Sequence, residues 1–370
     1  MIFKNCTFFN EFFEKEFGDI EIEDGKIKQI GILGDGVDMG GTLLVPGFVD
    51  VHIHGCAGGD ASDGDAEGLE KMAKELAGHG VTSFCPTTMT LSESDLRKAV
   101  STIAGFKGKG TKVAGINLEG PYISMSKKGS QNPENIRAGS REEFDELYAL
   151  SGGKIKLITV APEAFESDGF IEYVSKKCRV AIGHTAANAD GCRRAIDCGA
   201  SHITHLFNAM TPMNHREAGV VGTALDDSRV TCELICDLEH ICPTVLRNAF
   251  RLLGEDRAVA VSDSMRAAGL GEGEFDLGGQ TVYVKDGRKY AVLEDGTLAA
   301  SITNLHEEFR NLVEIGVDFK TALKACTINP ARAIGEDERI GSIAVGKAAD
   351  LVFLGENLEI KEVYIDGTLA

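Results

Sequence analysis

Residues 48–54 read FVDVHIH, an apolar and β-branched run that ends on two histidines. A strand as continuously apolar as this is buried on both faces, as in a parallel sheet covered by helices. Seven further runs of this kind follow, at 81–88, 113–120, 155–163, 180–185, 202–207, 231–237 and 258–264. The segments between them carry apolar residues at helical spacing and end in glycine, as DAEGLEKMAKELAGHG does at 65–80. Eight β/α units in about 250 residues predict an α/β fold of the (β/α)8 TIM-barrel type, with a doubly wound open sheet as the alternative.

The two ends of the chain have a different texture from the middle. DIEIEDGKIKQIGI at 19–32 alternates apolar and polar residues around an Asp24-Gly25 turn, and residues 341–370 repeat this pattern. Neither end holds enough apolar residues to fold alone. We therefore predict a discontinuous β-sandwich domain from 1–46 plus 336–370, and a catalytic barrel domain over 47–335.

One segment interrupts the β/α alternation after the eighth run. Residues 266–301 are glycine-rich and strand-like, with an Asp286-Gly287 turn. This composition predicts a β-hairpin insertion that flanks the mouth of the barrel.

The charge balance restricts the partners of the chain. Its 38 basic and 57 acidic residues leave a formal net charge of −19, which repels phosphate backbones and anionic lipids. The longest apolar runs, such as 43–51, are strand-sized and far short of the roughly 18 residues that a membrane span needs. We expect neither a nucleic-acid partner nor a membrane partner.

Cysteine usage and the start of the chain indicate the compartment. The ten cysteines stand singly and form no C-x-x-C pair, so we expect reduced, buried residues and no catalytic cysteine. MIFKNCTFFNEFFEKEFGD at 1–19 has neither a basic segment nor a clean apolar segment of a secretory signal. These features predict a cytoplasmic protein.

Polar residues close five of the eight apolar runs, where hydrophobic or turn residues would be expected. They are His52, His54, Glu119, His184, His205 and Asp263. In a barrel, the carboxyl ends of the strands converge on the face where active sites are built. Imidazole and carboxylate donors gathered there suit a zinc-like or iron-like divalent ion.

Each of these residues also has a structural alternative. A lone histidine in an apolar strand is usually a hydrogen-bonded core residue, and Glu119 before Gly120-Pro121 has the alternative of a turn or helix-cap carboxylate. His52 and His54 favour the site, because alternate residues of a strand face the same side. The coincidence of six such residues on five strand ends favours a shared site.

Three other histidines are assigned structural roles. His79 follows a helix and is expected to act at its C-terminal cap, while His306 stands at a predicted helix start. His202 begins the strand whose far end is His205, so we place it at the opposite end of the barrel.

Several motifs together resemble the amidohydrolase superfamily. They are VPGFVDVHIHG at 45–55, NLEGPYIS at 117–124, IGHTAA at 182–187, THLFNAM at 204–210, and NPARAIG with GSIAVGKAADLVFL near the end. LEGP, GHT, THLFNAM, HREAG and SDSM are similar to its group of N-acetylglucosamine-6-phosphate deacetylases. The resemblance runs over essentially the whole chain and implies metal-dependent deacetylation of that sugar phosphate to glucosamine 6-phosphate and acetate.

The resemblance also implies roles for individual residues. Glu119, His184 and His205 would hold the metal, and Asp263 would carry the proton. The groups that bind the sugar and its phosphate would be Gln131, Asn208, Ala209, Arg216, His240 and Ala300. Arg216 would reach the site from the neighbouring subunit of a homodimer, and on spacing alone it has the alternative of a salt bridge with Glu217.

The number of metal ions depends on His52 and His54. Both lie on one face of a strand, where they could hold a second ion bridged through Glu119. We expect one or two divalent ions per chain, zinc or iron. A metal held by two imidazoles and a carboxylate keeps an open position for water, whose pKa it lowers toward ~7.

Other functions stay open at this point. A deacetylase of the galactosamine 6-phosphate epimer differs in the substrate by one hydroxyl group, which the sequence does not resolve. The resemblance implies that cyclic amidases of the same superfamily carry a metal-bridging lysine on the fourth strand. The run 155–163 has no lysine at its carboxyl end, so this alternative is less favoured. A non-catalytic sugar-phosphate sensor is disfavoured because Asp263 and all the expected metal ligands are present.

Overall fold

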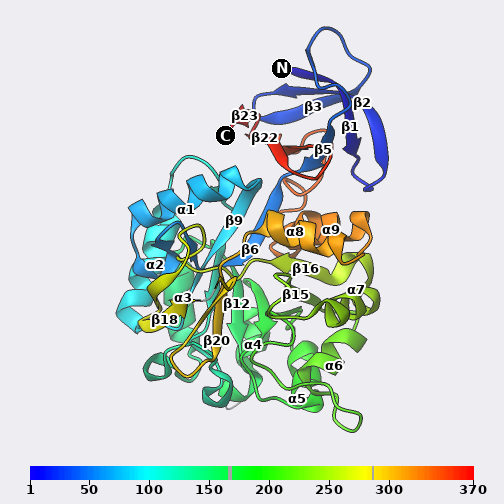
Figure 1. Cartoon of the computed structure of the whole chain (residues 1–370). Helices are drawn as coiled ribbons and strands as arrows, with labels where there is room; N and C mark the ends of the chain where they lie inside the picture. The colour runs from blue at the N-terminus through cyan, green and yellow to red at the C-terminus, as the bar shows by residue number, and fades with distance from the viewer. Residues whose placement is uncertain (166–168, 286) are drawn as a thin grey trace.

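The computed structural model describes residues 1–165, 169–285 and 287–370. Its centre is a barrel of parallel strands surrounded by helices (Figure 1). The barrel strands are β6 (Phe48–Ile53), β9 (Val81–Thr88), β11 (Ile116–Glu119), β12 (Ile155–Val160), β13 (Arg179–Ile182), β14 (His202–Ile203), β15 (Thr231–Ile235) and β16 (Ala258–Val261). A short strand, β10 (Lys112–Val113), pairs in parallel with β9.

The barrel closes between its last and first strands. The backbone N–H of Asp263 donates to the carbonyl of His52 at 2.9 Å, and the N–H of His54 donates to the carbonyl of Ser264 at 2.9 Å. Each of the eight predicted runs overlaps one barrel strand. The predicted TIM barrel is therefore confirmed over the doubly wound alternative.

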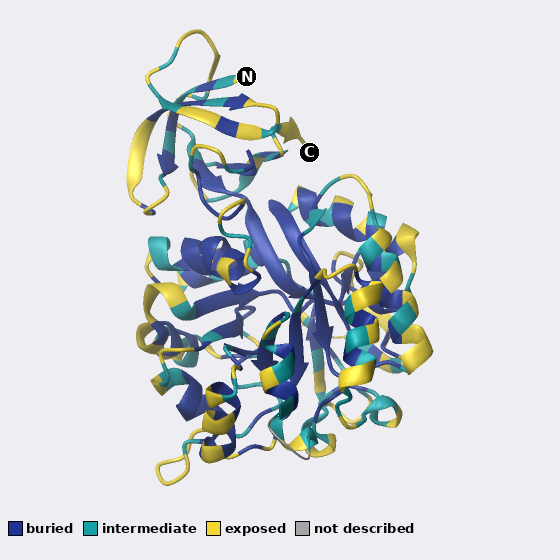
Figure 2. Cartoon of the chain, turned by 180° about the vertical axis from the view of Figure 1, so that it is seen from behind, coloured by how far each residue is buried: buried dark blue, intermediate teal, exposed yellow. Residues whose placement is uncertain are grey.

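Helices cover the outside of the barrel, with buried residues toward its strands and exposed residues on the outer side (Figure 2). Polar side chains cap several of them; Asp65, for example, accepts from the N–H groups of Glu67 and Gly68 at the start of α1. The α-helices are α1 (Ala66–Gly78), α2 (Glu93–Gly105), α3 (Arg141–Leu150), α4 (Gly169–Val174), α5 (Ala189–Asp197), α6 (Gly219–Asp226), α7 (Pro243–Arg257), α8 (Leu305–Glu314), α9 (Phe319–Cys326) and α10 (Ile328–Ala333).

Short elements occupy the loops between barrel strands and helices. Single 3₁₀ turns form at η1 (Ala61–Asp63), η2 (Met125–Lys127), η3 (Pro133–Asn135) and η4 (Pro162–Ala164). Two short strands, β7 (Gly55–Cys56) and β8 (Gly59–Asp60), pair antiparallel after β6.

Strands from both ends of the chain form one continuous sheet beside the barrel (Figure 1). They are β1 (Ile2–Phe9), β2 (Lys15–Glu23), β3 (Lys26–Gly31), β4 (Val37–Asp38), β5 (Leu43–Pro46), β21 (Leu351–Leu354), β22 (Ile360–Ile365) and β23 (Thr368–Leu369). The amino-terminal strand β5 pairs with the carboxyl-terminal strand β21. Phe3, Phe8, Ile20, Leu44 and Phe353 pack in its core, so each end of the chain completes the burial of the other.

The insertion after the eighth barrel strand is a sheet of two hairpins. Its strands are β17 (Gly273–Leu277), β18 (Gln280–Val284), β19 (Tyr290–Val292) and β20 (Leu298–Ser301). The first hairpin turns at Gly278-Gly279, where both residues have positive φ as a tight two-residue turn requires. Asp286 of the predicted turn lies outside the described residues. The backbone N–H of Ser301 donates to the carbonyl of Asp263 at 2.9 Å, which docks the sheet on the end of β16.

Two expectations from composition can be compared with the structure. Eight of the ten cysteines are buried, while Cys198 is half-buried and Cys242 is exposed. Within the described ranges, the structure contains no helix with the length and apolar character needed to cross a membrane.

Candidate active site

The predicted site residues meet at the carboxyl ends of the barrel strands. Three of them, His184, His205 and Asp263, adopt positive φ angles of 46°, 26° and 46°. This left-handed conformation is unfavourable for residues other than glycine, and such strain is concentrated at functional sites. Each of these side chains is turned inward immediately after its strand ends.

Glu119, at the end of β11, is the centre of the cluster. Its Oε1 lies 3.1 Å from His184 Nε2 and 2.9 Å from His205 Nε2. The two imidazole Nε2 atoms lie only 3.1 Å apart. Two imidazole nitrogens and one carboxylate oxygen at this spacing form a group that could hold a metal ion.

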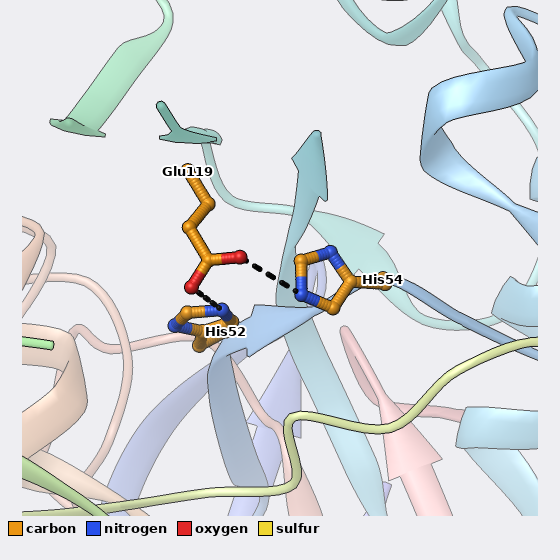
Figure 3. Close-up of side chains that lie close together, drawn as sticks. All are labelled: His52, His54 and Glu119. Atoms are coloured by element: carbon orange, nitrogen blue, oxygen red, sulfur yellow. Dashed lines mark ion pairs between the residues drawn. The ribbon is translucent and has the colours of Figure 1, made fainter. Parts of the chain in front are cut away.

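His52 and His54 form a second group with the same carboxylate (Figure 3). His52 Nε2 lies 3.4 Å from Glu119 Oε1, and His54 Nε2 lies 3.3 Å from Glu119 Oε2. Both imidazoles point from β6 toward Glu119, as their alternation along the strand predicts. Glu119 therefore stands between two groups of possible metal ligands.

Hydrogen bonds set the orientation of three of the four imidazoles. His184 Nδ1 donates to the carbonyl of Lys127 at 2.9 Å, and His54 Nδ1 donates to the carbonyl of Thr87 at 3.1 Å. His52 Nδ1 lies 2.8 Å from the Glu233 carboxylate. Because carbonyl and carboxylate oxygens only accept, each ring carries its proton on Nδ1 and turns the lone pair of Nε2 toward Glu119.

The donor set fits a divalent ion. His52 Nε2 is buried and has no hydrogen-bond partner within the described part of the chain, although a buried polar atom is rarely left unpaired. Lone pairs from several imidazoles converge on one buried carboxylate, so the cluster lacks a positive charge at its centre. A zinc-like or iron-like ion would supply that charge with the nitrogen and oxygen ligands that such ions prefer.

The pKa values show the same need for a cation. Burial acts to lower the pKa of the His52 imidazole, but the carboxylates of Glu233, Glu119 and Asp263 raise its pKa to about 9. Although burial acts in the opposite direction, His184 and His52 hold the pKa of Glu119 well below its usual range. The cluster therefore attracts either protons or a metal, and the two compete.

Asp263, which follows β16, also approaches the histidine pair. Its Oδ1 is 3.5 Å from His52 Nε2 and 3.2 Å from His54 Nε2. Burial acts to raise its pKa, but His52 and His54 lower it overall. Asp263 is thus an ionised carboxylate that is able to accept a proton.

A cavity of about 310 Å³ opens over this cluster. Four of the predicted substrate-binding residues line it, namely Gln131, Asn208, Ala209 and His240. His240 is fixed by a 2.6 Å contact between its Nδ1 and Asp237 Oδ2. Ser126, Lys127 and the segment Thr297–Ala299 also border the cavity, so the loop after β11 and the inserted sheet both form its wall.

Two predicted substrate-binding residues, Ala300 and Arg216, do not line this cavity. Ala300 is fully buried in β20, and its neighbour Ala299 lines the cavity instead. Arg216 is exposed on a turn between Asn214 and Glu217 and does not line the cavity of its own chain. In the described part of the chain no ion pair joins Arg216 to Glu217, whose Oε1 accepts from the N–H groups of Ala189 and Gly219.

Gln131 contacts a protein side chain in this structure. Its amide nitrogen donates to Glu119 Oε2 at 2.5 Å, and its amide oxygen accepts from the N–H of Thr90 at 2.7 Å. Gln131 therefore holds the same carboxylate oxygen that faces His54.

Sequence reasoning missed Glu233 and gave an incomplete account of His202. Glu233 interrupts the apolar run TCELICD at 231–237, and that buried acid was the available signal. His202 is not one of the possible metal ligands, as predicted, but β14 is so short that His202 reaches Glu233 at 3.0 Å. His79 contacts Glu75, and His306 contacts the carbonyl of Leu358, so both lie apart from the cavity as predicted.

Imidazoles and carboxylates gathered at the carboxyl face of a TIM barrel define a site of the metal-assisted hydrolytic type. The chain belongs to the amidohydrolase family, whose family model matches residues 43–370.

Sequence relatives indicate which members of this family the chain is similar to. The chain is 36% identical to the N-acetylglucosamine-6-phosphate deacetylase of Bacillus subtilis (strain 168) over 337 residues, covering 89% of this chain and 85% of the relative. It is 35% identical to the N-acetylgalactosamine-6-phosphate deacetylase of Escherichia coli O157:H7, covering 95% of this chain and 94% of the relative.

Solved structures of related proteins superpose on this chain over its whole length. The N-acetylglucosamine-6-phosphate deacetylase from Pasteurella multocida superposes with a TM-score of 0.93 at 31% identity, covering 100% of this chain and 99% of that one. A mutant of the Mycobacterium smegmatis enzyme in complex with N-acetyl-D-glucosamine-6-phosphate gives a TM-score of 0.91 at 30% identity, with 100% and 98% coverage.

Proposed function

We propose that this protein hydrolyses the acetamido bond of N-acetylglucosamine 6-phosphate, yielding glucosamine 6-phosphate and acetate, in amino-sugar catabolism. The observation that carries this proposal is the full-length match to deacetylases of that substrate, in a chain whose Glu119, His184, His205 and Asp263 meet beside one cavity.

The residues present divide the chemistry among them. Glu119, His184 and His205 would hold one divalent ion, zinc or iron, and His52 with His54 would hold a second through Glu119. When bound, such an ion lowers the pKa of a water molecule and polarises a carbonyl oxygen. Asp263 accepts the proton of the attacking water and delivers it to the amine nitrogen as the C–N bond breaks.

The cavity wall would hold the sugar. Asn208, Ala209 and His240 border the same space as Asp263, on the side formed by the loops after β14 and β15. Gln131 keeps Glu119 oriented and stands at the edge of the cavity near the reacting amide.

The substrate phosphate is an anion, so its binding requires a local positive charge, because the chain as a whole has a net charge of −19. Arg216 would supply it from a second copy of the chain, since it is exposed and does not line the cavity of its own chain. An apolar groove lies close to its turn, between α6 and α7, with Met213 and Leu252 each 58% exposed. We therefore propose a homodimer in which this face is covered and Arg216 crosses to the partner's cavity.

The compartment follows from side-chain chemistry. Eight of the ten cysteines are buried and the sequence has no C-x-x-C pair, which suits a reducing environment, and we place the protein in the cytoplasm.

The galactosamine 6-phosphate epimer is the second candidate substrate. One of the similar proteins is a deacetylase of that epimer. The two sugars differ by the orientation of one hydroxyl group, so the residues of the cavity wall decide between them.

One assay tests these proposals together. Acetate release is measured with the zinc-loaded or iron-loaded protein on N-acetylglucosamine 6-phosphate, the galactosamine epimer and unphosphorylated N-acetylglucosamine. We expect the first to have the highest kcat/KM. A higher value on the epimer would reassign the substrate, and absence of acetate with all three would refute the deacetylase function.

A further inference from the structure

Glu233 lies on β15, inside the barrel and beneath the candidate site, and is fully buried. Its carboxylate is a member of neither possible metal group. Burial of a carboxylate is unfavourable unless hydrogen-bond donors and positive charge compensate it. The contacts of Glu233 therefore show what keeps this carboxylate in the barrel.

One oxygen of Glu233 joins the two groups of possible ligands. Oε2 lies 2.8 Å from His52 Nδ1 and accepts from the backbone N–H of His205 at 3.1 Å. His52 belongs to the group on β6, and His205 belongs to the group with His184. A single carboxylate oxygen therefore fixes one ligand of each group.

The other carboxylate oxygen of Glu233 contacts His202. Oε1 lies 3.0 Å from His202 Nε2, and His202 Nδ1 lies 2.6 Å from Thr231 Oγ1. All of these contacts are satisfied when His202 is neutral, donates from Nε2 and accepts the Thr231 hydroxyl proton at Nδ1. Half-buried Thr231 and buried His202 and Glu233 thus form a chain of contacts that ends on His52.

This chain determines what His52 offers to the site. With its proton on Nδ1 and donated to Glu233, the ring presents the lone pair of Nε2, the atom that is buried without a hydrogen-bond partner. A carboxylate behind a ligating imidazole also makes the imidazole a stronger ligand.

We propose that Glu233 is a positioning residue for the metal centre, which holds His52 as a ligand and, together with His202, keeps its Nε2 directed at Glu119. This inference rests on the proposed metal site. It implies that the group of His52, His54 and Glu119 binds its ion tightly when the Glu233 carboxylate is present and weakly when it is not.

The test uses Glu233→Gln, which removes the charge and keeps the shape. Gln can retain its oxygen toward His52 and His205 while its amide nitrogen faces His202. The neutral His202 ring accommodates this change by moving its proton to Nδ1, where Thr231 Oγ1 can accept it and in turn donate to the carbonyl of Ser201. The variant is therefore expected to fold.

Glu308→Gln is the control for replacing a buried carboxyl group outside the site. Glu308 is also fully buried, but it contacts the N–H of Cys236 and the hydroxyl of Thr303 and takes no part in the candidate site. Metal is removed from the full-length proteins with a chelator, and Zn²⁺ binding is followed by competition with a chromophoric chelator. Binding of Co²⁺, followed by its visible absorption, gives a spectroscopic signature of ligation.

We expect the wild type to bind two equivalents of Zn²⁺ and Glu233→Gln to bind the weaker equivalent about 10–100-fold less tightly, with an altered Co²⁺ spectrum. Glu308→Gln should match the wild type. A wild type that binds only one equivalent, or an unchanged second affinity in Glu233→Gln, would overturn the proposal.

A measurement on the zinc-loaded wild type guards against a variant that does not fold. Long-range ¹H–¹⁵N spectra distinguish the ring tautomers, and the His52 signals are identified by their loss in His52→Asn. We expect His52 to be protonated on Nδ1 and ligating through Nε2, and the opposite tautomer would contradict the role of Glu233. Because neither experiment uses substrate, failure of the deacetylase function would leave both results interpretable.

Discussion

Among the described residues that line the cavity, Asp263 is the one carboxylate outside both possible metal groups, and its Oδ1 lies 3.2 Å from His54 Nε2. Asp263→Asn keeps the size of the side chain and removes the proton acceptor. We expect kcat to fall by at least ~10²-fold, the effect typical of lost general acid–base catalysis, while metal content is unchanged. Turnover near that of the wild type in a fully metallated variant would exclude Asp263 from the mechanism.

His52 and His54 decide whether the chain binds a second ion. Together they contribute only neutral imidazoles and a share in Glu119, so their site should be the weaker one and the more sensitive to acid. We expect His52→Asn combined with His54→Asn to reduce bound metal from two equivalents to one and to leave appreciable activity. Elemental analysis of the reconstituted proteins measures this, and complete loss of metal in the double variant would contradict the assignment.

The loop after β11 is held by an ion pair at the start of α3. Arg137 contacts the Glu143 carboxylate at 2.5 Å, and the Tyr122 hydroxyl donates to the same carboxylate at 2.9 Å. This pair anchors the segment that carries Lys127 and Gln131 into the cavity. Burial acts to raise the pKa of Glu143, but Arg137 and Tyr122 lower it overall.

The direction of this shift predicts how stability depends on pH. Because the folded pKa lies below the unfolded value of about 4.5, ionised Glu143 stabilises the fold above that pH, and this stabilisation is lost as pH falls through the folded pKa. We expect Glu143→Gln to lower the free energy of unfolding by up to ~1.5–3 kcal/mol at pH 7, and by much less once the pH lies below the folded pKa. Urea titrations at the two pH values measure this, and an equal loss at both would show that the charge is not responsible.

The turn between Asn214 and Glu217 presents Arg216 to solvent. A guanidinium that binds phosphate contributes only when the phosphate is present. We expect Arg216→Ala to raise KM for the phosphorylated sugar much more than for the unphosphorylated one. Arg193→Ala, on the exposed face of α5, is a control that should change neither KM.

If Arg216 acts across a dimer interface, wild-type activity should also fall on dilution below the dimer dissociation constant. Sedimentation at matched concentrations measures the dimer fraction directly. Equal effects of Arg216→Ala on both substrates would assign the residue a structural role.

Metal removal should weaken the whole barrel, because β6, β11, β13 and β14 all contribute to the possible metal groups through their ends. A ligand that binds only the folded state stabilises it by about 2.7 kcal/mol when present at 100 times its Kd. We expect a chelator to lower the Tm and added Zn²⁺ to restore it. In Glu119→Gln, which lacks the shared carboxylate, the chelator should have little effect, and an unchanged Tm in the chelated wild type would argue against a metal centre.

The strands of the barrel and the positions of the chemical groups were predictable from the sequence. Apolar β-branched runs separated by helical segments are local patterns, and the direction of each strand assigns its last residue to one face of the barrel. His52, His54, Glu119, His184, His205 and Asp263 could therefore be placed together without coordinates, because their positions depend only on where each strand ends.

The partners of these residues were decided by the tertiary structure. Glu233 reaches His52 across 181 residues of sequence and His202 across 31, and the register between neighbouring strands, which no local pattern encodes, creates both contacts. The same holds for Gln131, whose loop brings it to Glu119, and for Arg216, whose turn leads it away from its own cavity. The sequence by itself determined which groups face the site, whereas the packing of the strands and loops decided which groups hold them in place.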